Sequence, residues 1–188
     1  MSSDSDHPPA WLSQARAGWQ WRGSARPPFA LVPGPGQESV WDYPRPPLLV
    51  ADPRAVRVLA GGVEIARTRA AVRVLETSHP PTFYVPRADV DMAALRVAGR
   101  GTFCEWKGDC AYYDVLSGES SLPRAAWSYE APFAEAAVIA GHLGFYAHEL
   151  ECWVGDERAR PQLGGFYGGW ITSELVGPFK GAPGTTGW

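Results

Sequence analysis

The chain alternates apolar and polar residues in short runs, and these runs predict β-strands. The clearest pair is Val56–Ala60 and Val63–Thr68, which are joined by Gly61 and Gly62. Strand side chains repeat every two residues, and a two-residue glycine linker suits the primed turns of a hairpin because glycine accepts positive φ. The pattern therefore predicts a β-hairpin over residues 56–68.

Other runs with the same period predict further short strands, while a few stretches have helical spacing. The strands are expected at residues 71–77, 82–85, 102–107, 109–116, 126–129, 145–146 and 151–154. Helices are expected over residues 89–95, with Asp89 as the N-cap, over 133–143 and over 9–17. Many glycines and prolines separate these elements, which is typical of strands joined by tight turns. The predicted fold class is mostly β, an all-β domain with one or two short helices.

At 188 residues the chain is expected to hold one domain, preceded by an arm. Residues 1–36 are predicted to be extended or partly disordered, and to wrap the domain by their tryptophans because tryptophan is costly to leave in water. The single domain spans residues 37–188. Its last part, 163–188, is rich in glycine and aromatic residues and is predicted to be an ordered coil. This coil is expected to lie over the domain or to enter a neighbouring chain, which would make a homodimer.

Composition narrows the classes of function. The formal net charge is −3 at pH 7, so the chain lacks the basic footprint of a nucleic-acid-binding protein. No apolar run approaches the ~20 residues of a membrane span, and the N-terminus lacks the basic and apolar regions of a signal peptide. We therefore expect a cytoplasmic protein without nucleic-acid or membrane partners. The three cysteines form no CxxC pair, which argues against a disulfide framework and a structural zinc site.

The strand expected at residues 71–77 places Glu76 on its apolar face, beside two valines. A carboxylate that points inward is costly unless it is paired or faces a polar pocket. His79 follows three residues later, and one carboxylate with one imidazole suffices for proton transfer near neutral pH. We therefore predict that Glu76 and His79 form a catalytic acid–base pair. In the alternative, Glu76 pairs with a core arginine such as Arg73 or Arg87, and the histidine caps a turn.

A lysine and a cysteine on the following strands are further candidates for catalysis. Only two lysines occur, Lys107 and Lys180, against 15 arginines. A general preference for arginine codons explains this scarcity and gives Lys180 no special role. Lys107 lies near Cys104, and lysine can shift its pKa or act as a nucleophile where arginine cannot. Lys107 is predicted to hold an anionic or carbonyl group, and Cys104 is a candidate nucleophile. In the alternative, Lys107 pairs with Glu105 or Asp109, and the cysteine is an inert core residue.

Aromatic residues are expected to form the walls of a pocket for a small molecule. The predicted ligand-binding set is Trp41, Tyr84, Arg87, Trp106, Tyr113 and Trp127. Aromatic-rich concave sites commonly bind planar or cationic small molecules, although the same rings would also fill a small β core. The sequence has no HxH or HxxxH pair and no phosphate-binding loop, so neither a metal site nor a cofactor is predicted.

Several segments together resemble a known bacterial family. They are VWDYPRPP, ETSHPPTFYVPRADV, TFCEWKGDCAYYDV, AWSYEAP, IAGHLGFY and the terminal FYGGWITSELVGPFKGAPGTTGW. From Ser39 to Trp188 the chain is similar to the bacterial domain-of-unknown-function family 427, and its tail resembles the actinobacterial branch. The resemblance implies that two antiparallel sheets cross in a tent-like or open-barrel arrangement around a pocket. The family also carries a nucleotidyl-transferase-like label, for which this sequence offers no paired-carboxylate metal motif.

The resemblance also implies which residues face the pocket. They are Glu76, His79, Tyr84, Arg87, Cys104, Trp106, Lys107 and Tyr113. We predict a small-molecule-binding β domain of unknown reaction, a metabolic enzyme if Glu76 and His79 transfer protons while Lys107 holds the ligand. The alternative is a non-catalytic module that binds a ligand or a partner in an aromatic cage. A third hypothesis is thiol chemistry at Cys104.

Overall fold

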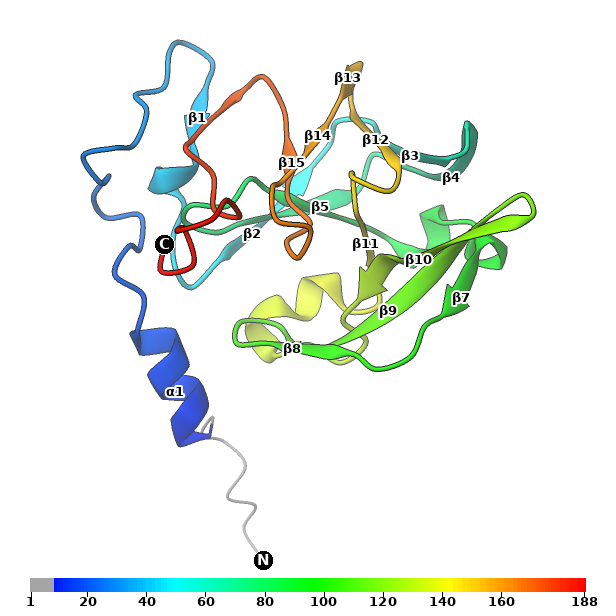
Figure 1. Ribbon diagram of the computed structural model, residues 1–188, viewed down its shortest axis with the longest axis horizontal. Coiled ribbons are helices and arrows are strands. Elements are labelled where there is room, and N and C mark those ends of the chain that lie inside the picture. The colour runs from blue at the N-terminus through cyan, green and yellow to red at the C-terminus, as the bar shows by residue number, and fades with distance from the viewer. Residues whose placement is uncertain (1–8) are drawn as a thin grey trace, which may run out of the picture.

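The computed structural model describes residues 9–188, which form mostly short strands (Figure 1). The larger sheet has the strand order β2 (Leu48–Asp52), β5 (Ala71–Leu75), β6 (Thr82–Val85), β11 (Leu143–Phe145), β10 (Ser120–Ser128), β9 (Gly108–Ser117) and β7 (Leu95–Val97), and β8 (Thr102–Cys104) also pairs with β9. The second sheet has the order β13 (Glu157–Arg158), β12 (Glu151–Val154), β3 (Val56–Ala60) and β4 (Val63–Thr68). Neighbours within both sheets are antiparallel. Neither sheet closes into a barrel in the described part of the chain, and the mostly β fold is confirmed.

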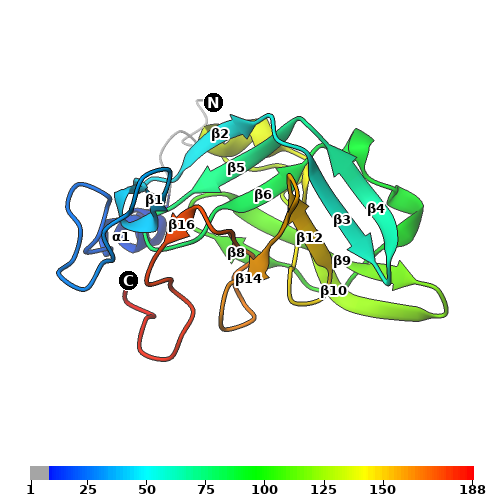
Figure 2. The same cartoon turned by 90° about the horizontal axis from the view of Figure 1, so that it is seen from above.

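Two shorter strand pairs involve the N-terminal arm and the C-terminal tail. β1 (Glu38–Ser39) runs parallel to β16 (Leu175–Val176), and β14 (Arg160–Pro161) runs antiparallel to β15 (Trp170–Ile171). In both views the arm and the last residues lie together, at the end of the molecule away from β3 and β4 (Figures 1 and 2). The tail thus packs on its own chain, and a homodimer through it stays a prediction.

The hairpin predicted around the two glycines is confirmed. β3 and β4 pair in antiparallel register, and Gly61 and Gly62 have φ of 56° and 80°. The strand predicted at residues 102–107 is too long, because β8 ends at Cys104. The chain turns there, and the amide of Lys107 donates to the carbonyl of Cys104 at 3.3 Å. Cys104 and Lys107 therefore stand at the two ends of a tight turn.

The helix predicted over residues 89–95 is wrong. The chain makes two separate 3₁₀ turns, η2 (Arg87–Asp89) and η3 (Met92–Ala94). Between them Val90 is extended and 8% exposed in the core, and it bridges to Ala66 of β4, so a continuous helix cannot form. The N-cap is Asp91, whose carboxylate accepts the amide of Ala93, while Asp89 accepts the hydroxyl of Thr68 instead.

The other helical elements are short. α1 spans Ala10–Ala17, as the spacing predicts, and η1 spans Val40–Asp42. In place of a helix over 133–143 there is one 3₁₀ segment, η4 (Ala134–Ile139), whose buried residues Ala136 and Ile139 are three apart. That separation suits the three residues per turn of a 3₁₀-helix.

The larger sheet is covered on both faces, and strand alternation decides which residue meets which layer. On β6, Phe83 and Val85 pack in the cluster shared with the second sheet, and Tyr84 lies in a cluster on the opposite face. On β9, Tyr113 joins the first cluster and Tyr112 the second. The second face, away from β3 and β4, is the one that carries the candidate site.

The described part of the arm wraps the domain. Residues 1–8 of the predicted arm lie outside the described residues. Trp21 packs edge to face on Trp41 with ring centroids 6.2 Å apart, and Trp19 stacks against the guanidinium of Arg45 at 4.2 Å. Trp11 is different, because it stays 55% exposed on α1.

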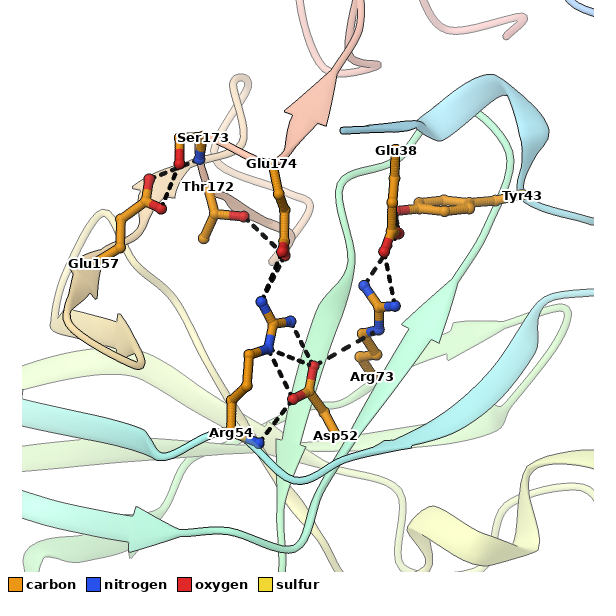
Figure 3. A network of polar contacts seen from close by, with 9 residues as sticks. All are labelled: Glu38, Tyr43, Asp52, Arg54, Arg73, Glu157, Thr172, Ser173 and Glu174. Atoms are coloured by element: carbon orange, nitrogen blue, oxygen red, sulfur yellow. Dashed lines mark hydrogen bonds and ion pairs between the residues drawn. The ribbon is translucent and has the colours of Figure 1, made fainter. Parts of the chain in front are cut away.

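A polar network fastens β1 and the tail to the larger sheet (Figure 3). Arg54 lies between Asp52 of β2 and Glu174 of the tail, with nitrogen–oxygen distances of 2.5 Å and 2.8 Å. Arg73 of β5 donates to Glu38 of β1 at 3.0 Å and lies 3.7 Å from Asp52. The network therefore ties β1 and the segment before β16 to the edge of the sheet.

Two glycines make room for Trp127 on the second face. The indole of Trp127 lies over Gly144 of the neighbouring strand, where an added Cβ would be 2.5 Å from ring atoms. Gly168 of the tail approaches the same ring from elsewhere, and its Cβ would lie 2.7 Å from Cζ2 and closer still to Cη2. Trp127 is only 5% exposed as a result.

Gly168→Ala is expected to lower the free energy of unfolding by about 1–3 kcal/mol, the usual cost of overpacking a rigid contact. Chemical denaturation would measure the change. Gly99→Ala is the matched control, because nothing lies within 4 Å of the Cβ it would add. Replacing Trp127 by Phe in the Gly168→Ala background should recover part of the loss. Equal stability of the Gly168→Ala and Gly99→Ala variants would contradict the packing described.

Candidate functional site

A cavity of about 280 Å³ opens on the second face of the larger sheet. β5, β6, β9 and β10 supply its floor, the turn after β8 supplies one wall, and the arm and the tail close it from the other side. Seven of the predicted site residues line it: Glu76, His79, Tyr84, Cys104, Trp106, Lys107 and Trp127. The fold thus brings together the polar and aromatic residues singled out around residues 76–107.

Aromatic side chains cross the floor of the cavity from strand to strand. In the strand register Tyr84 is opposite Gly144, Gly144 is opposite Trp127, and Trp127 is opposite Tyr112. The indole Nε1 of Trp127 donates to the hydroxyl of Tyr84 at 3.1 Å. Tyr129 and Tyr146 continue this aromatic surface. The cavity floor is therefore built from rings held in fixed positions.

Three residues predicted to bind ligand do not line the cavity. Tyr113 points to the opposite face of β9 and donates to Glu130 at 2.8 Å. Arg87 forms an ion pair with Glu130 and donates to the carbonyl of Gly141 at 3.1 Å. Trp41 is fully buried beside the arm and the tail.

Tyr112, one residue away from Tyr113, lines the cavity instead. Adjacent residues of a strand face opposite sides, so a one-residue difference moves the side chain to the other face. Trp41 does not line the cavity because it packs in a separate hydrophobic cluster, at the end of the molecule where the arm and the tail lie.

Glu76 lies just after β5, and Arg45 is its partner. Arg45 Nε donates to Glu76 Oε1 at 3.1 Å, and the Arg45 side chain is fully buried. The alternative that Glu76 pairs with a core arginine is confirmed, but the partner is Arg45, since Arg73 and Arg87 bind Glu38 and Glu130. Burial raises the pKa of the Glu76 carboxyl, but the neighbouring His79, Lys107 and Arg45 lower it by more. The net result is a pKa below the usual range, so the group is a carboxylate at neutral pH.

His79 is brought to Glu76 by a tight turn. The amide of His79 donates to the carbonyl of Glu76 at 3.0 Å, and Ser78 within the turn has φ of 71°. His79 Nε2 lies 4.0 Å from Glu76 Oε1, which is longer than a hydrogen bond. The two side chains therefore lie side by side in the cavity wall without a direct hydrogen bond.

The tautomer of His79 follows from Gln162. The Oε1 of Gln162 accepts the amide of Gly169 at 3.1 Å, so its Nε2 is a donor. That Nε2 lies 2.8 Å from the carbonyl of Lys180 and 3.0 Å from His79 Nδ1. Nδ1 must then accept, which places the imidazole proton on Nε2, the nitrogen that faces Glu76. His79 is therefore a hydrogen-bond donor to the cavity.

Burial lowers the pKa of His79 to about 4. The positive charges of Lys180, Arg45 and Lys107 act in the same direction, and the carboxylate of Glu76 opposes them. The imidazole is accordingly neutral at physiological pH. Because His79 Nδ1 already accepts from Gln162, Glu76 is the member of the predicted acid–base pair with a free acceptor in the described structure, its Oε2.

Lys107 extends into the cavity from the turn that follows β8. Its ammonium lies 5.5 Å from the ring centroid of Tyr129. Burial lowers the pKa of this amine, but the facing Cys104, Tyr84 and Glu76 raise it by more, so the pKa ends above its ordinary value. In the described part of the chain no carboxylate lies within 4 Å of the ammonium, and the alternative pairing with Glu105 or Asp109 is therefore wrong.

Lys180 is the main residue that sequence reasoning missed. It lies in the tail, is 1% exposed, and lines the same cavity as Lys107. Its Nζ donates to the main-chain oxygen of Trp188 at 2.8 Å and lies 3.9 Å from the ring centroid of Trp19. Burial and the neighbouring Arg45 lower the pKa of this amine to about 8. The available signal was its rarity, since the chain has only two lysines.

Other cavity residues also come from distant segments. Trp19 belongs to the arm, and Gln162 and Tyr167 belong to the tail. Trp19 Nε1 donates to Glu105 Oε1 at 3.2 Å, and the ring of Tyr167 packs edge to face on His79 at 4.7 Å. No local pattern marks these residues, because each acts only through its position against strands far away in the sequence.

The cavity wall also holds an indole donor without a partner. Trp106 is 6% exposed, and its Nε1 has no hydrogen-bond partner among the residues the structure describes. A buried donor left unpaired costs on the order of 1–3 kcal/mol. Among these same residues, no group of three or more His, Cys, Asp or Glu side chains is arranged to hold a metal ion. None of the described helices is both long and apolar enough to cross a membrane.

Comparison with known proteins identifies one family. A family model described as a domain of unknown function (DUF427), named NTP_transf_9, matches residues 48–156. The matched range contains the cavity floor and the Glu76, His79, Cys104 and Lys107 side chains. Trp19, Gln162, Tyr167 and Lys180 lie outside it. A search of curated proteins finds no match to the chain.

Stability is expected to fall as the pH drops from 6.5 to 5, because His79 resists protonation in the folded state. The unfolded chain binds a proton near pH 6.5, whereas folded His79 binds it near pH 4. Each pKa unit corresponds to about 1.4 kcal/mol, so the folded state should lose about 2 kcal/mol over this range. The pKa of the Glu76 carboxyl is also lowered in the folded state, so its contribution is intact above about pH 4.5 and does not change between pH 6.5 and 5.

Denaturant titrations at both pH values would test this expectation. His79→Gln should show a much shallower pH dependence, and His142→Gln should behave as the unmodified chain. Parallel losses for the unmodified chain and His79→Gln would show that the histidine is not held neutral.

Cys104 is expected to react with iodoacetamide faster than Cys110 or Cys152 at neutral pH. It is the only one of the three that is not buried, and burial raises the pKa of both other thiols. Peptide mapping by mass spectrometry would compare the three rates, with Cys104→Ser as the control. Equal or slower labelling of Cys104 would remove thiol chemistry from consideration.

Proposed function

The chain belongs to the DUF427 family, whose description assigns no reaction, and from its cavity we propose that it binds a small planar organic anion. The anion would lie on the aromatic floor with its charged group toward Lys107. Glu76 and His79 would then face the bound molecule as proton acceptor and hydrogen-bond donor. A non-catalytic binding module is the second candidate, because the aromatic floor alone suffices to hold a ring.

The observation that carries the proposal is the convergence of the two lysines. Lys107 and Lys180 are far apart in the sequence, yet both line this one cavity. In the part of the chain that is described, no Asp or Glu side chain lies within 4 Å of either ammonium, and Lys180 Nζ donates to the main-chain oxygen of Trp188 at 2.8 Å. Buried cations are normally paired, and an anionic ligand would supply the missing partner of Lys107.

The charge balance of the cavity favours a ligand with one negative charge. Lys107 and Lys180 line the cavity as cations, and Glu76 and Glu105 line it as carboxylates. Arg45 adds a third positive charge behind Glu76. The main-chain oxygen of Trp188 already accepts from Lys180 and Arg45, so Lys107 is the cation whose charge a bound anion would balance.

Size and surface favour a small ring or a conjugated chain. The cavity volume of about 280 Å³ is just below the roughly 300–1,000 Å³ of pockets for drug-sized ligands. Tyr84, Trp127 and Tyr129 present ring surfaces that pack well on planar molecules. A single aromatic ring with a carboxylate has the right size and charge.

The polar groups support proton transfer as the reaction, if one takes place. Glu76 Oε1 is held by Arg45, while its Oε2 has no hydrogen bond within residues 9–188. That free oxygen suits the removal of a proton from a bound molecule. His79 would donate its Nε2 proton to a ligand oxygen, and the Lys107 ammonium would stabilise negative charge that develops there.

Binding of phenylacetate, compared with its neutral analogue phenylacetamide, would test the proposal by calorimetry. The acid should bind and the amide should bind at least tenfold more weakly. Lys107→Met should weaken phenylacetate binding at least tenfold, since a hydrogen bond to a charged group contributes about 1.5–3 kcal/mol. Arg69→Met, which removes a positive charge from an exposed position, is the matched control and should leave binding unchanged.

Two results would overturn the proposed function. One is equal binding of the acid and the amide, and the other is unchanged affinity of Lys107→Met for the acid. Turnover of any bound ligand would favour the enzyme, whereas the binding module requires that no bound ligand is converted. If turnover is found, Glu76→Gln should abolish it while the ligand still binds.

A further inference from the structure

The hydroxyl of Tyr84 is a buried polar group on the cavity floor. The Tyr84 side chain is 1% exposed and lines the cavity. Its neighbours across the sheet are Val72 of β5 and Gly144 of β11, and neither residue type offers a hydroxyl a side-chain partner. Buried hydroxyls are normally hydrogen-bonded, so the partners of this one must come from farther away.

One partner is Trp127, which fixes the direction of the hydrogen bond. The indole Nε1 is a donor only, so its 3.1 Å contact with the Tyr84 hydroxyl uses a lone pair of the phenolic oxygen. The two rings meet at 86° with their centroids 6.1 Å apart, and Gly144 and Gly168 pack closely against the indole. The Tyr84 oxygen is therefore the acceptor, and its own proton points elsewhere.

Tyr84 keeps this proton at neutral pH, because burial raises the pKa of the phenol above its ordinary value. Within residues 9–188 the hydroxyl makes no hydrogen bond besides the one from Trp127, so its proton has no acceptor there. Lys107 and Cys104 both act on the pKa of Tyr84, which places the hydroxyl on the side of these cavity residues. The floor therefore contains an oriented donor whose acceptor must come from a bound molecule.

Two other tyrosine hydroxyls of the cavity already have partners. Tyr112 shares a 3.0 Å hydrogen bond with Thr102, and Tyr146 donates at 3.0 Å to a main-chain carbonyl of the tail. Tyr84 differs from both, because its oxygen accepts a hydrogen bond while its proton stays free.

We propose that Tyr84 donates its hydroxyl proton to an uncharged oxygen of the ligand, and that the ligands of this cavity are therefore planar aromatic acids with a hydroxyl, ether or carbonyl oxygen on the ring. The inference rests on the proposed function, in which Lys107 binds the charged group, and it adds a second point of recognition. Tyr84 is then the residue that determines which aromatic acids bind well.

An aromatic acid without such an oxygen would leave the Tyr84 donor buried against carbon. A buried donor without an acceptor costs free energy, and sites built to hydrogen-bond a ligand oxygen discriminate strongly against analogues that lack it. The hydrogen bond from Trp127 strengthens this effect, because linked hydrogen bonds polarise one another. The affinity for an aromatic acid should therefore depend on its ring substituent as well as on its charge.

The test is calorimetry of the unmodified chain with the ortho, meta and para isomers of hydroxyphenylacetate and of fluorophenylacetate. Fluorine is close to a hydroxyl in size but is a poor acceptor, so each pair compares one ring position at constant charge. At least one hydroxyl isomer should bind about fivefold or more tightly than its fluoro partner, the gain of one hydrogen bond. If no hydroxyl isomer exceeds its fluoro partner, the inference is overturned.

Tyr84→Phe should remove this gain, so that the hydroxyl and fluoro compounds bind equally. Tyr113→Phe is the matched control, because the Tyr113 hydroxyl lies on the opposite face of β9 and donates to Glu130. Tyr129 is the alternative donor, since its ring centroid lies 6.3 Å from that of Tyr84 and it lines the same cavity. A gain that persists in Tyr84→Phe, or that is lost in Tyr129→Phe alone, would assign the donor elsewhere and overturn the inference.

The outcomes separate the two proposals, because the acid–amide comparison tests the charge and the hydroxyl–fluoro comparison tests the donor. If phenylacetate is preferred over phenylacetamide and no hydroxyl isomer gains affinity, the anion site stands and the role of Tyr84 fails. If none of these acids binds, both proposals fail. The hydroxyl–fluoro comparison uses the unmodified chain, so it can overturn the inference even if Tyr84→Phe fails to fold.

Discussion

The buried guanidinium of Arg45 is the interaction on which the candidate site depends. Its nitrogens donate to Glu76, to the carbonyls of Trp21 and Thr77, and to the main-chain oxygen of Trp188. One side chain thus joins the end of β5, the N-terminal arm and the C-terminal tail. Arginine suits this position because its planar fork offers five donors and stays charged when buried. The same cation keeps Glu76 ionised and disfavours a charge on Lys180.

A second constraint is steric, and it fixes the cavity floor. Trp127 lies flat only because Gly144 and Gly168 lack side chains where the indole passes. The ring then donates to Tyr84, and the aromatic surface becomes continuous across three strands. Charged groups occupy the walls while the floor stays apolar. This separation allows a planar molecule to pack its face on the aromatic floor while the charged groups of the walls contact its edge.

The titratable groups that line the cavity have contrasting surroundings. His79 is buried among cations and stays neutral, Glu76 is paired and stays ionised, and Lys107 and Lys180 have opposite pKa shifts. Pairs of groups whose surroundings separate their pKa values are a hallmark of acid–base sites. Glu76, His79 and Lys107 lie within the range that matches the family, whereas Arg45 and Lys180 lie outside it. The matched core thus supplies the floor and three of these four titratable groups, and the segments on either side supply Arg45 and Lys180.

The sequence by itself determined what depends on local order: the β3–β4 hairpin, the mostly β class, and the inward Glu76 followed by His79. These follow from a period of two and from the cost of burying a charge, both of which are readable over a few residues. Only the tertiary structure decided that Arg45 pairs with Glu76, that Tyr112 rather than Tyr113 lines the cavity, and that Lys180 lines the same cavity as Lys107. Partners far apart in sequence are chosen by the path of the chain, and the face of a strand residue changes with a one-residue shift in register. Neither choice leaves a mark in the local pattern of the sequence.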